Sequence, residues 1–575
     1  MAKIVYACVR DAANAHLIKK RIDSIIHKLV PDNIPDARCK VVDNGNIIYG
    51  ISTYTEAIME TTDSVCMGVA YSGAEKWWQP LNGHPEGTYA IFRADENYVE
   101  AVTDIACTRA VWYYKDEEIF IAGTSQRAVI AVAGKFDFER RNIPWMLSAG
   151  SLGPSLSWCK NLHFADPYTT VLLNRKTWGL TIKSLKASFV PSALPAKEFQ
   201  EQFKKTLLGS FSAIDIDLSK WALPMSGGYD SRGIACLLRD TERDISRLNT
   251  ITWGTQSSAQ NKNSDGYLGG AVAKALGMQH KFWPTDDMKE PIEKIFDRFI
   301  HCSEGRIDHI TGYTDGMIIW KNIFDSGKHG ILRGDEAFGA PHCNTFLRSR
   351  LWSEFKLCAD FSNLENFEQQ YGYEKQVIPE QLKENPGKET PGTYRERFYQ
   401  GFRMPVMLSA LSDIKYAYTE ILNPFLSKKI MLQARTIPDA GRKERALYIK
   451  TIREISPAIP YATEKATGSR EQILNTPEAV KILTAEISAD YMKELFSEEF
   501  LSKVITKLKR PVAIVHSNYK SKIKAFFSRN VPIAIKEKFR KSMPKPALDN
   551  GILAFRIYII GKIYKMFTAD FKQIN

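Results

Sequence analysis

Residues 226–231 read Ser-Gly-Gly-Tyr-Asp-Ser, a combination of side chains that can bind phosphate. Apolar residues 221–223 precede this run, and a stretch with helical character, 233–238, follows it. A tight turn between a strand and a helix aims backbone N–H groups at one point, and glycines let the backbone approach an anion closely. The serines can donate hydrogen bonds, and Asp230 can hold a divalent cation beside phosphates. The chain has no G-x-x-x-x-G-K-[ST] pattern, and Ser-Gly-Gly runs also occur in ordinary loops.

Two later strand-like runs strengthen the phosphate hypothesis. Residues 248–254 end in Trp253-Gly254. After a polar stretch comes Asp265, and then a helix-like run from Ala271 that leads to Gly277 and His280. Residues 330–332 lead into Arg-Gly-Asp-Glu at 333–336, ahead of Phe338-Gly339. In this order the three runs resemble the synthetase part of the N-type ATP pyrophosphatases, which include asparagine synthetase, β-lactam synthetase and GMP synthetase.

The resemblance implies a site for ATP and Mg²⁺ in which a carboxylate becomes an acyl-adenylate and pyrophosphate leaves. Charge builds on the pyrophosphate, so the site needs Mg²⁺ and N–H donors. Asp230 and Asp335 would hold Mg²⁺. The remaining nucleotide contacts would come from Met225, Ser226, Gly227, Gly228, Ser231, Trp253, Gly254, Gly334 and Glu336. The alternative for Asp335-Glu336 is a solvated turn, and we expect His280 to be structural.

Lys465 is the expected catalytic lysine. It follows a basic helix-like stretch that starts at Arg442 and an Ile-Pro segment, and it precedes Gly468, as the late lysine does in the family. In that role it would neutralise charge during adenylation and amide formation. The alternative is an ordinary surface lysine. Arg333 stands where many asparagine synthetases have an acidic loop, and it could offer its fork of donors to a substrate carboxylate or phosphate.

The first part of the chain resembles the glutaminase domain of class II amidotransferases, on short period-two strands within 87–128 and a closing strand near 162–173. That likeness implies a four-layered αββα fold of the N-terminal-nucleophile type. A working glutaminase has Cys at position 2, but this chain has Ala2, and it lacks the R-G-P-D glutamine-binding sequence. Cys8 lies in the expected first strand, where we expect it to be buried and inert. Removal of residues 1–7 is the alternative that would expose it.

Composition supports several domains of ordinary globular character. The chain has 575 residues, 44% hydrophobic and 25% charged, and its nine cysteines form no C-x-x-C pair, which fits reduced thiols in a cytoplasm. We predict a glutaminase-like domain over 1–195, a parallel-sheet α/β ATP pyrophosphatase domain over 200–500 and a basic helical tail over 501–575. No run of about 18 apolar residues suggests a membrane span.

The tail concentrates the positive charge of the chain. Residues 503–565 hold 16 Lys and Arg against two acidic residues, whereas the net charge of the whole chain is +13. Residues 552–567 mix these cations with apolar and aromatic groups, which suits an anionic membrane surface or an acidic partner. The alternative is a helical extension that packs on the core and leaves a solvated basic face.

Together these patterns predict a ligase that adenylates a carboxylate and passes the acyl group to ammonia or an amine without a glutaminase of its own. The candidate acids are aspartate and a carboxylated sugar of a surface polysaccharide, and the expected location is cytoplasmic, at the membrane if the tail binds there. The alternatives are a cyclase like those of lasso peptides, a tRNA-modifying enzyme and a non-catalytic nucleotide-binding scaffold. Nucleic acid is the less favoured partner, because the glutaminase-like region does not belong to a tRNA-lysidine synthetase.

Overall fold

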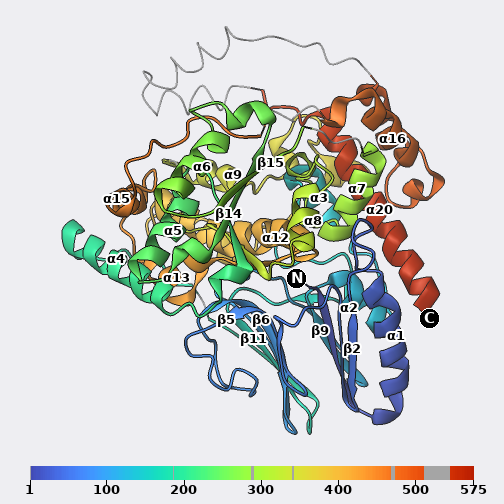
Figure 1. The fold of residues 1–575 in the computed structure, drawn as a ribbon. Helices are drawn as coiled ribbons and strands as arrows, with labels where there is room; N and C mark the ends of the chain where they lie inside the picture. The colour runs from blue at the N-terminus through green and yellow to red at the C-terminus, as the bar shows by residue number, and fades with distance from the viewer. Residues whose placement is uncertain are drawn as a thin grey trace.

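The computed structural model describes residues 2–185, 187–286, 290–339, 342–467, 473–509 and 544–574. Strands up to Ser184 form two antiparallel sheets, and strands between Trp221 and Leu422 form a parallel sheet surrounded by helices (Figure 1). The mixed α/β class expected from the sequence is therefore present. Helix α4 begins at Ala196 after an irregular stretch, and α17 (Glu498–Leu508) spans residue 500. The domain boundaries at 195–200 and 500 stay a prediction.

The first two sheets have six strands each, and all their pairings are antiparallel. In spatial order the first sheet contains β10 (His163–Phe164), β8 (Trp112–Lys115), β9 (Ile119–Gly123), β1 (Ile4–Val9), β3 (Ile47–Ile51) and β2 (Lys40–Asn44). The second contains β12 (Gly179–Ser184), β11 (Thr169–Asn174), β7 (Tyr98–Thr103), β6 (Gly87–Ala94), β5 (Val65–Ala70) and β4 (Met59–Glu60).

Alternation along β1 explains how the layers stack. Ile4, Tyr6 and Cys8 face the second sheet and share its core, whereas the residues between them face helices. Those helices are α1 (Ala15–His27), which buries four isoleucines along one face, and α2 (Gln126–Ala133). Gly50 of β3 allows a close approach, because a Cβ there would lie 2.5 Å from Ile22. One face of the sheet pair is thus covered by helices.

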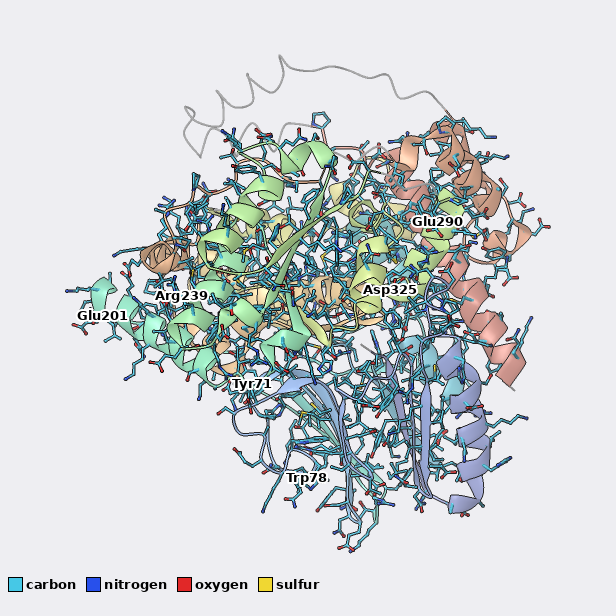
Figure 2. All side chains as sticks on the ribbon, in the orientation of Figure 1. Tyr71, Trp78, Glu201, Arg239, Glu290 and Asp325 are labelled. Atoms are coloured by element: carbon cyan, nitrogen blue, oxygen red, sulfur yellow. The ribbon has the colours of Figure 1, made fainter. Side chains whose placement is uncertain are left out.

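The other face of the sheet pair differs from the αββα arrangement expected from the resemblance. Among the described residues up to 185, helices pack on the first sheet, and the outer face of the second sheet packs under the loop between β5 and β6. Trp77 of this loop lies against Ile91 and Val102. Figure 2 labels Tyr71, at the start of the loop where the second sheet meets the helical part, and Trp78, farther along it. A loop with a buried tryptophan therefore replaces the expected fourth, helical layer.

The third sheet has the strand order of a doubly wound α/β fold. Its parallel strands are β15 (His280–Pro284), β14 (Asn249–Gly254), β13 (Trp221–Pro224), β16 (Gly330–Leu332) and β17 (Glu420–Leu422), in that spatial order. The chain order reverses between β13 and β16. In open parallel sheets the crevice at such a reversal, beyond the carboxyl ends of the strands, is the usual ligand site.

Helices cover both faces of this sheet, as its apolar strands require. Leu223 and Leu332 face one layer, whereas Ala222 and Ile331 face the other. The first layer contains α4 (Ala196–Ser212), α5 (Asp230–Asp240), α6 (Asp265–Ala275), α13 (Lys428–Ala434) and α15 (Ala446–Ile455). The second contains α7 (Ile292–Ser303), α8 (Ile318–Asp325) and α12 (Ser409–Tyr416).

Further helices fill the space around these layers. They are α3 (Asn142–Ala149), α9 (Phe346–Trp352), α10 (Phe367–Tyr371), α11 (Pro391–Phe398), α14 (Asp439–Arg442), α16 (Pro477–Ile487) and α17. A π-helical stretch, Tyr399–Leu408, with Pro405 inside it, joins α11 to α12. None of the helices in the described residues is long and apolar enough to cross a membrane.

The last helix, α20 (Asn550–Ile574), packs on the body of the protein. Its apolar and aromatic side chains are buried against α2, α3, α16 and α17, and Tyr558 and Ile560 have no exposed surface. In Figure 1 it runs beside α7 and α16 and ends near α1. The apolar groups of 552–567, which the sequence offered to a membrane or an acidic partner, are therefore covered by the chain itself. The basic residues at 510–543 lie outside the described residues, so their partner stays a prediction.

Candidate active site

The predicted phosphate loop joins β13 to α5 at the carboxyl edge of the parallel sheet. Met225 is buried, and its N–H donates to the Ile251 carbonyl at 2.8 Å, which ties the start of the loop to β14. The Ser231 hydroxyl accepts from the Ser226 N–H at 3.0 Å and lies 3.2 Å from the Ser226 hydroxyl. The Gly228 N–H donates to the same Ser226 hydroxyl at 3.2 Å. The two serines therefore hold the loop in a closed turn.

Asp265, at the start of α6, completes the inner contacts of the loop. Its carboxylate accepts from the Gly227 N–H at 2.9 Å. Ser264 caps α6, its side chain accepting from the Gly266 N–H. Since the N–H groups of Ser226, Gly227 and Gly228 already have partners, the free donors for an anion are those of the first turn of α5, which have no intrahelical acceptor.

The second acidic loop, residues 333–336, follows β16 and lies directly against the phosphate loop. A Cβ added at Gly334 would come within 2.7 Å of the Asp230 Cβ, so only glycine permits this approach. Asp335 pairs with Arg333 at 2.8 Å. Glu336 accepts from the Phe338 N–H, and its backbone carbonyl accepts from the Tyr399 hydroxyl at 3.1 Å. The fold thus brings Asp230 and Glu336 to one place, from loops about a hundred residues apart.

Arg445 is the cation that these carboxylates share. It precedes α15 with a left-handed backbone, φ 58°, and its Nη1 lies 3.0 Å from Asp230 Oδ1 and 3.2 Å from Glu336 Oε1. Burial and the neighbouring Asp230 charge raise the pKa of Glu336 to about 7, against the opposing effect of Arg445. Burial also raises the pKa of Asp230, and the Asp335 charge adds to that rise. One guanidinium therefore leaves the acidic cluster with excess negative charge.

The carboxylates of this cluster would need phosphate oxygens as further ligands to hold Mg²⁺. Within the described residues no three or more His, Cys, Asp and Glu side chains are arranged to hold a metal ion by themselves. Mg²⁺, however, is commonly held by one or two carboxylates plus the phosphates of a nucleotide. Burial, first, and the neighbouring carboxylates raise the pKa values of Asp230 and Glu336, and a bound cation would oppose both effects. Asp230 and Asp335 are the residues that would hold the ion.

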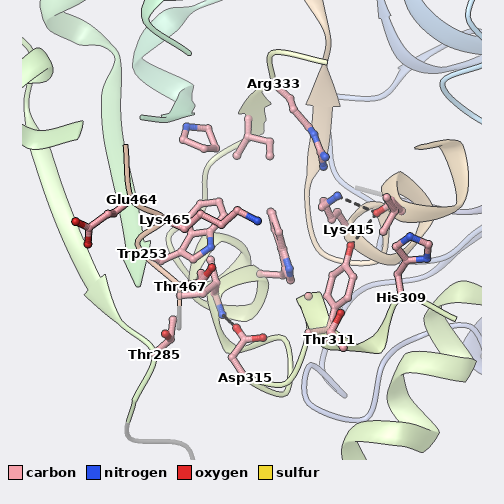
Figure 3. A pocket seen from close by; sticks show the side chains of 17 residues that line it. Trp253, Thr285, His309, Thr311, Asp315, Arg333, Lys415, Glu464, Lys465 and Thr467 are labelled. Carbon is pink, nitrogen blue, oxygen red and sulfur yellow. Dashed lines mark hydrogen bonds between the residues drawn. The ribbon is translucent and has the colours of Figure 1, made fainter. Parts of the chain in front are cut away.

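A cavity of about 890 Å³ opens beside the two loops (Figure 3). Three strands contribute to it through Pro224, Trp253 and Ile331, and Arg333 follows the last of these strands. Helices α8 and α12 contribute Trp320 and Lys415. Figure 3 shows the side chains of Arg333, Lys415, His309 and Lys465 around the cavity. Its size lies towards the upper end of the range for small-molecule sites.

The segment that carries Lys465 crosses over the phosphate loop. The Ala462 N–H donates to the Gly227 carbonyl at 3.1 Å, and a Cβ added at Gly254 would lie 2.7 Å from the Ala466 Cβ. Lys465 is an exposed residue that lines the cavity, and its charge opposes the effect of burial on the pKa of Asp265. Its catalytic role stays a prediction, and Gly468 lies outside the described residues.

The other predicted residues surround the same region. Trp253 packs edge-to-face on Trp320 with ring centroids 5.6 Å apart. His280 lies on the edge strand β15, and its Nδ1 is 2.9 Å from the Thr250 hydroxyl. Burial lowers the pKa of His280. These contacts give His280 the structural place that the sequence favoured.

Sequence reasoning missed Arg445 and Lys415. Arg445 lies in the stretch Arg442-Lys443-Glu444-Arg445, where four charged residues in a row look like a solvated helix face. Lys415 lies among apolar and aromatic neighbours on α12, and its ammonium is buried. The sequence signal for Lys415 was a single lysine in a helix whose other residues are mostly buried.

The N-terminal strand carries no exposed nucleophile. Cys8 is fully buried in β1, and burial raises the pKa of its thiol to about 11. Ala2 is also buried, and its carbonyl accepts from Arg109 at 3.1 Å. Arg109 in turn forms an ion pair with Glu420 of β17 at 2.5 Å. The start of the first sheet is therefore tied to the edge of the parallel sheet.

Comparisons with known proteins add little to this geometry. No protein-family model matches the chain, and no curated protein matches it. One solved structure that matches is the glutamine phosphoribosylpyrophosphate amidotransferase from B. subtilis, complexed with ADP and GMP, at 8% identity and a TM-score of 0.20. The match covers 49% of this chain and 65% of that one. A likeness this slight carries no argument about fold or function.

Proposed function

We propose that the protein is an asparagine synthetase-like ligase that adenylates a carboxylate with ATP and forms an amide from the acyl-adenylate. The observation that carries the proposal is the contact of Gly334 with Asp230, which places the second acidic loop on the N-terminus of α5 at the reversal of strand order. An anion at this point would meet free N–H groups, and a cation would meet carboxylates.

Each step of the reaction has residues that fit it. The first turn of α5 and the serines beside it would bind the leaving pyrophosphate. Mg²⁺ held by Asp230 and Asp335 would supply positive charge to the phosphates. The acid would lie in the cavity, where its oxygen attacks the α-phosphorus of ATP and pyrophosphate leaves. An amine would then attack the acyl carbon, AMP would leave, and Lys465 would offset charge in both steps.

The nitrogen would come from ammonia, from an amine substrate or from a partner. Ala2 stands where a glutaminase has its cysteine, and Cys8 is buried with a raised pKa, so neither residue would serve as a nucleophile for glutamine. The open cavity suits an amine that diffuses in with the acid.

Pyrophosphate release from Mg-ATP tests the proposal, with a panel of acids and with ammonia or glutamine as nitrogen source. We expect acid-dependent release that is coupled to amide formation with ammonia and not with glutamine. Asp230→Ala and Lys465→Ala should reduce the rate by about 10²-fold or more, because each removes charge stabilisation of the transition state.

Lys450→Ala is the matched control, since Lys450 is an exposed lysine on α15. Release without acid dependence, or release that Asp230→Ala leaves unchanged, would refute the ligase assignment. ATP binding with no release for any acid would favour a non-catalytic scaffold.

A further inference from the structure

The cavity contains two cations that lie close together on separate elements. Arg333 follows β16, and Lys415 lies on α12. In Figure 3 the two side chains extend into the same part of the cavity. The positive charge of Arg333 contributes to lowering the pKa of Lys415, after the larger effect of burial. The two groups therefore repel each other at short range.

Lys415 is buried, and the only charges that act on its pKa oppose each other among the described residues: Arg333 lowers the pKa and Asp335 raises it, both after the larger effect of burial. Its side chain is 5% exposed, and its Nζ donates to the Leu411 carbonyl at 3.0 Å. Among the described residues it forms no ion pair, whereas the comparably buried Lys3 pairs with Glu304 at 2.7 Å. A buried ammonium without a counter-ion is costly, so such groups are normally paired. A buried lysine at a cavity wall that forms no ion pair with the protein is suited to bind an anionic ligand.

Aromatic rings border the same point. The Lys415 Nζ lies 5.5 Å from the centre of the Trp320 ring and 6.0 Å from that of Tyr313, and both residues line the cavity. An anionic group bound to Lys415 would hold whatever is attached to it against these rings. A flat or cyclic body buries more surface there than a short aliphatic chain does.

We propose that Lys415 and Arg333 bind the anionic group of an acid whose carboxylate is attached to a ring, with Tyr313 and Trp320 packing on that ring. This inference rests on the proposed function, because it names the class of acid that the ligase takes. It separates a cyclic acid, such as a sugar acid or an aromatic acid, from aspartate, which has no ring. Arg333, whose Nε pairs with Asp335 at 2.8 Å, would offer the Nη donors of its guanidinium, and Lys415 a point charge, a pair that suits the two oxygens of one carboxylate.

Calorimetric titration of the full chain tests the inference without turnover. The probes are glucuronate, benzoate, aspartate and glucose, each with Mg²⁺ and a non-hydrolysable ATP analogue. At least one of the two cyclic acids should bind about tenfold or more tightly than aspartate, which lacks the ring, and than glucose, which lacks the charged hydrogen bonds. Whether glucuronate or benzoate binds better tells a sugar ring from an aromatic one.

The Lys415→Met variant assigns the binding to this residue. Methionine is unbranched, is shorter than lysine by one atom and has no charge, so the variant should fold with a melting temperature no lower than that of the wild type. Its affinity for the preferred cyclic acid should fall about tenfold or more. Lys321→Met is the control, because Lys321 lies on α8 next to Trp320 but pairs with Asp325 outside the cavity. That control should bind as the wild type does.

The outcomes separate this inference from the proposed function. Aspartate binding as tightly as the cyclic acids, or a Lys415→Met variant with unchanged affinity, would overturn the inference even if pyrophosphate release were acid-dependent. A lower melting temperature with unchanged affinity would show a structural lysine instead. Selective binding of a cyclic acid, lost in Lys415→Met, with no pyrophosphate release from Mg-ATP would uphold the inference on the cavity and remove the ligase assignment.

Discussion

Arg445 lies 3.0 Å from Asp230 and also contacts Glu336, so a single guanidinium links the two loops of the candidate site. Asp230 comes from the N-terminus of α5, Glu336 from the loop after β16, and Arg445 from the residue before α15. Both carboxyl groups keep raised pKa values in spite of Arg445. Burial is the larger cause of both shifts, and Arg445 offsets it only in part, so a cation that reached these carboxyl groups would favour their ionised forms.

Replacement of Arg445 by methionine should destabilise the protein and increase its response to Mg²⁺. Without the guanidinium, Asp230 and Glu336 repel each other, and we expect a loss of about 2 kcal/mol at pH 8 after allowing for their partial exposure to solvent. Urea unfolding with and without Mg²⁺ measures both effects. Arg453→Met is the control, since Arg453 lies outside the cluster and bonds the Tyr229 hydroxyl at 2.7 Å. Equal stability of Arg445→Met and Arg453→Met would contradict the prediction.

Replacement of Glu336 by glutamine should stabilise the protein at high pH. The pKa of Glu336 is raised from 4.5 to about 7, so its ionisation in the folded state is unfavourable. The cost is absent below about pH 4.5, grows between 4.5 and 7, and is complete above 7. We expect Glu336→Gln to be more stable than the wild type by about 2 kcal/mol at pH 8 and by little at pH 5. A stability difference that does not change between these pH values would show that Glu336 is not the titrating group.

Replacement of Gly334 by alanine should separate the two loops. The new Cβ would lie 2.7 Å from the Asp230 Cβ, closer than carbon atoms pack, so one loop must move. We expect acid-dependent pyrophosphate release to fall by about 10²-fold, since small displacements at a reacting centre have effects of that size. Gly209→Ala in α4 is the control, because a Cβ there meets nothing within 4 Å. That control should keep full activity and gain about 0.5–1 kcal/mol of stability.

Sequence patterns predicted the local elements of the site more fully than its long-range contacts. The strand, glycine turn and helix over 221–240 follow from neighbouring residues, as does the buried strand that holds Cys8. The pairing of Arg445 with Asp230 spans 215 positions and depends on how α15 packs, which no local pattern records. The packing of α20 could not be predicted for the same reason. An apolar helix face in the sequence is equally consistent with a membrane surface and with the protein's own core.

The buried thiol of Cys8 should not react in the folded protein. Its pKa is raised to about 11, so almost no thiolate forms at pH 8, and β1 is covered on both faces. Differential alkylation with iodoacetamide, read by mass spectrometry, should label Cys8 only after unfolding. Cys39, which is partly exposed, should be labelled earlier and serves as the internal reference. Fast labelling of Cys8 at pH 8, or glutamine hydrolysis that Cys8→Ala abolishes, would contradict the assignment of this region as lacking a nucleophile.

Replacement of Arg556 by methionine should loosen the docking of α20. Arg556 pairs with Asp308 at 2.6 Å and donates to the Leu147 and Ser148 carbonyls at 2.8 and 3.0 Å. Burial alone would raise the pKa of Asp308. The charge of Arg556 and the hydrogen bond with His309 outweigh this effect and lower the pKa to about 2. Because this carboxylate is ionised at pH 7, Arg556→Met leaves it with His309 as its remaining charged partner, and we expect a loss of about 2 kcal/mol at pH 7.

Urea unfolding at pH 7 and pH 4 measures this loss. The difference in free energy of unfolding between wild type and variant should remain mostly unchanged at pH 4, since Asp308 of the wild type is still ionised there. Lys565→Met, an exposed change on the same helix, should alter stability by less than about 0.5 kcal/mol. His309, which lies 3.1 Å from Asp308, lines the cavity, so Arg556→Met should also weaken acid binding there. Unchanged stability and unchanged binding in Arg556→Met would show that α20 docks through its apolar face alone.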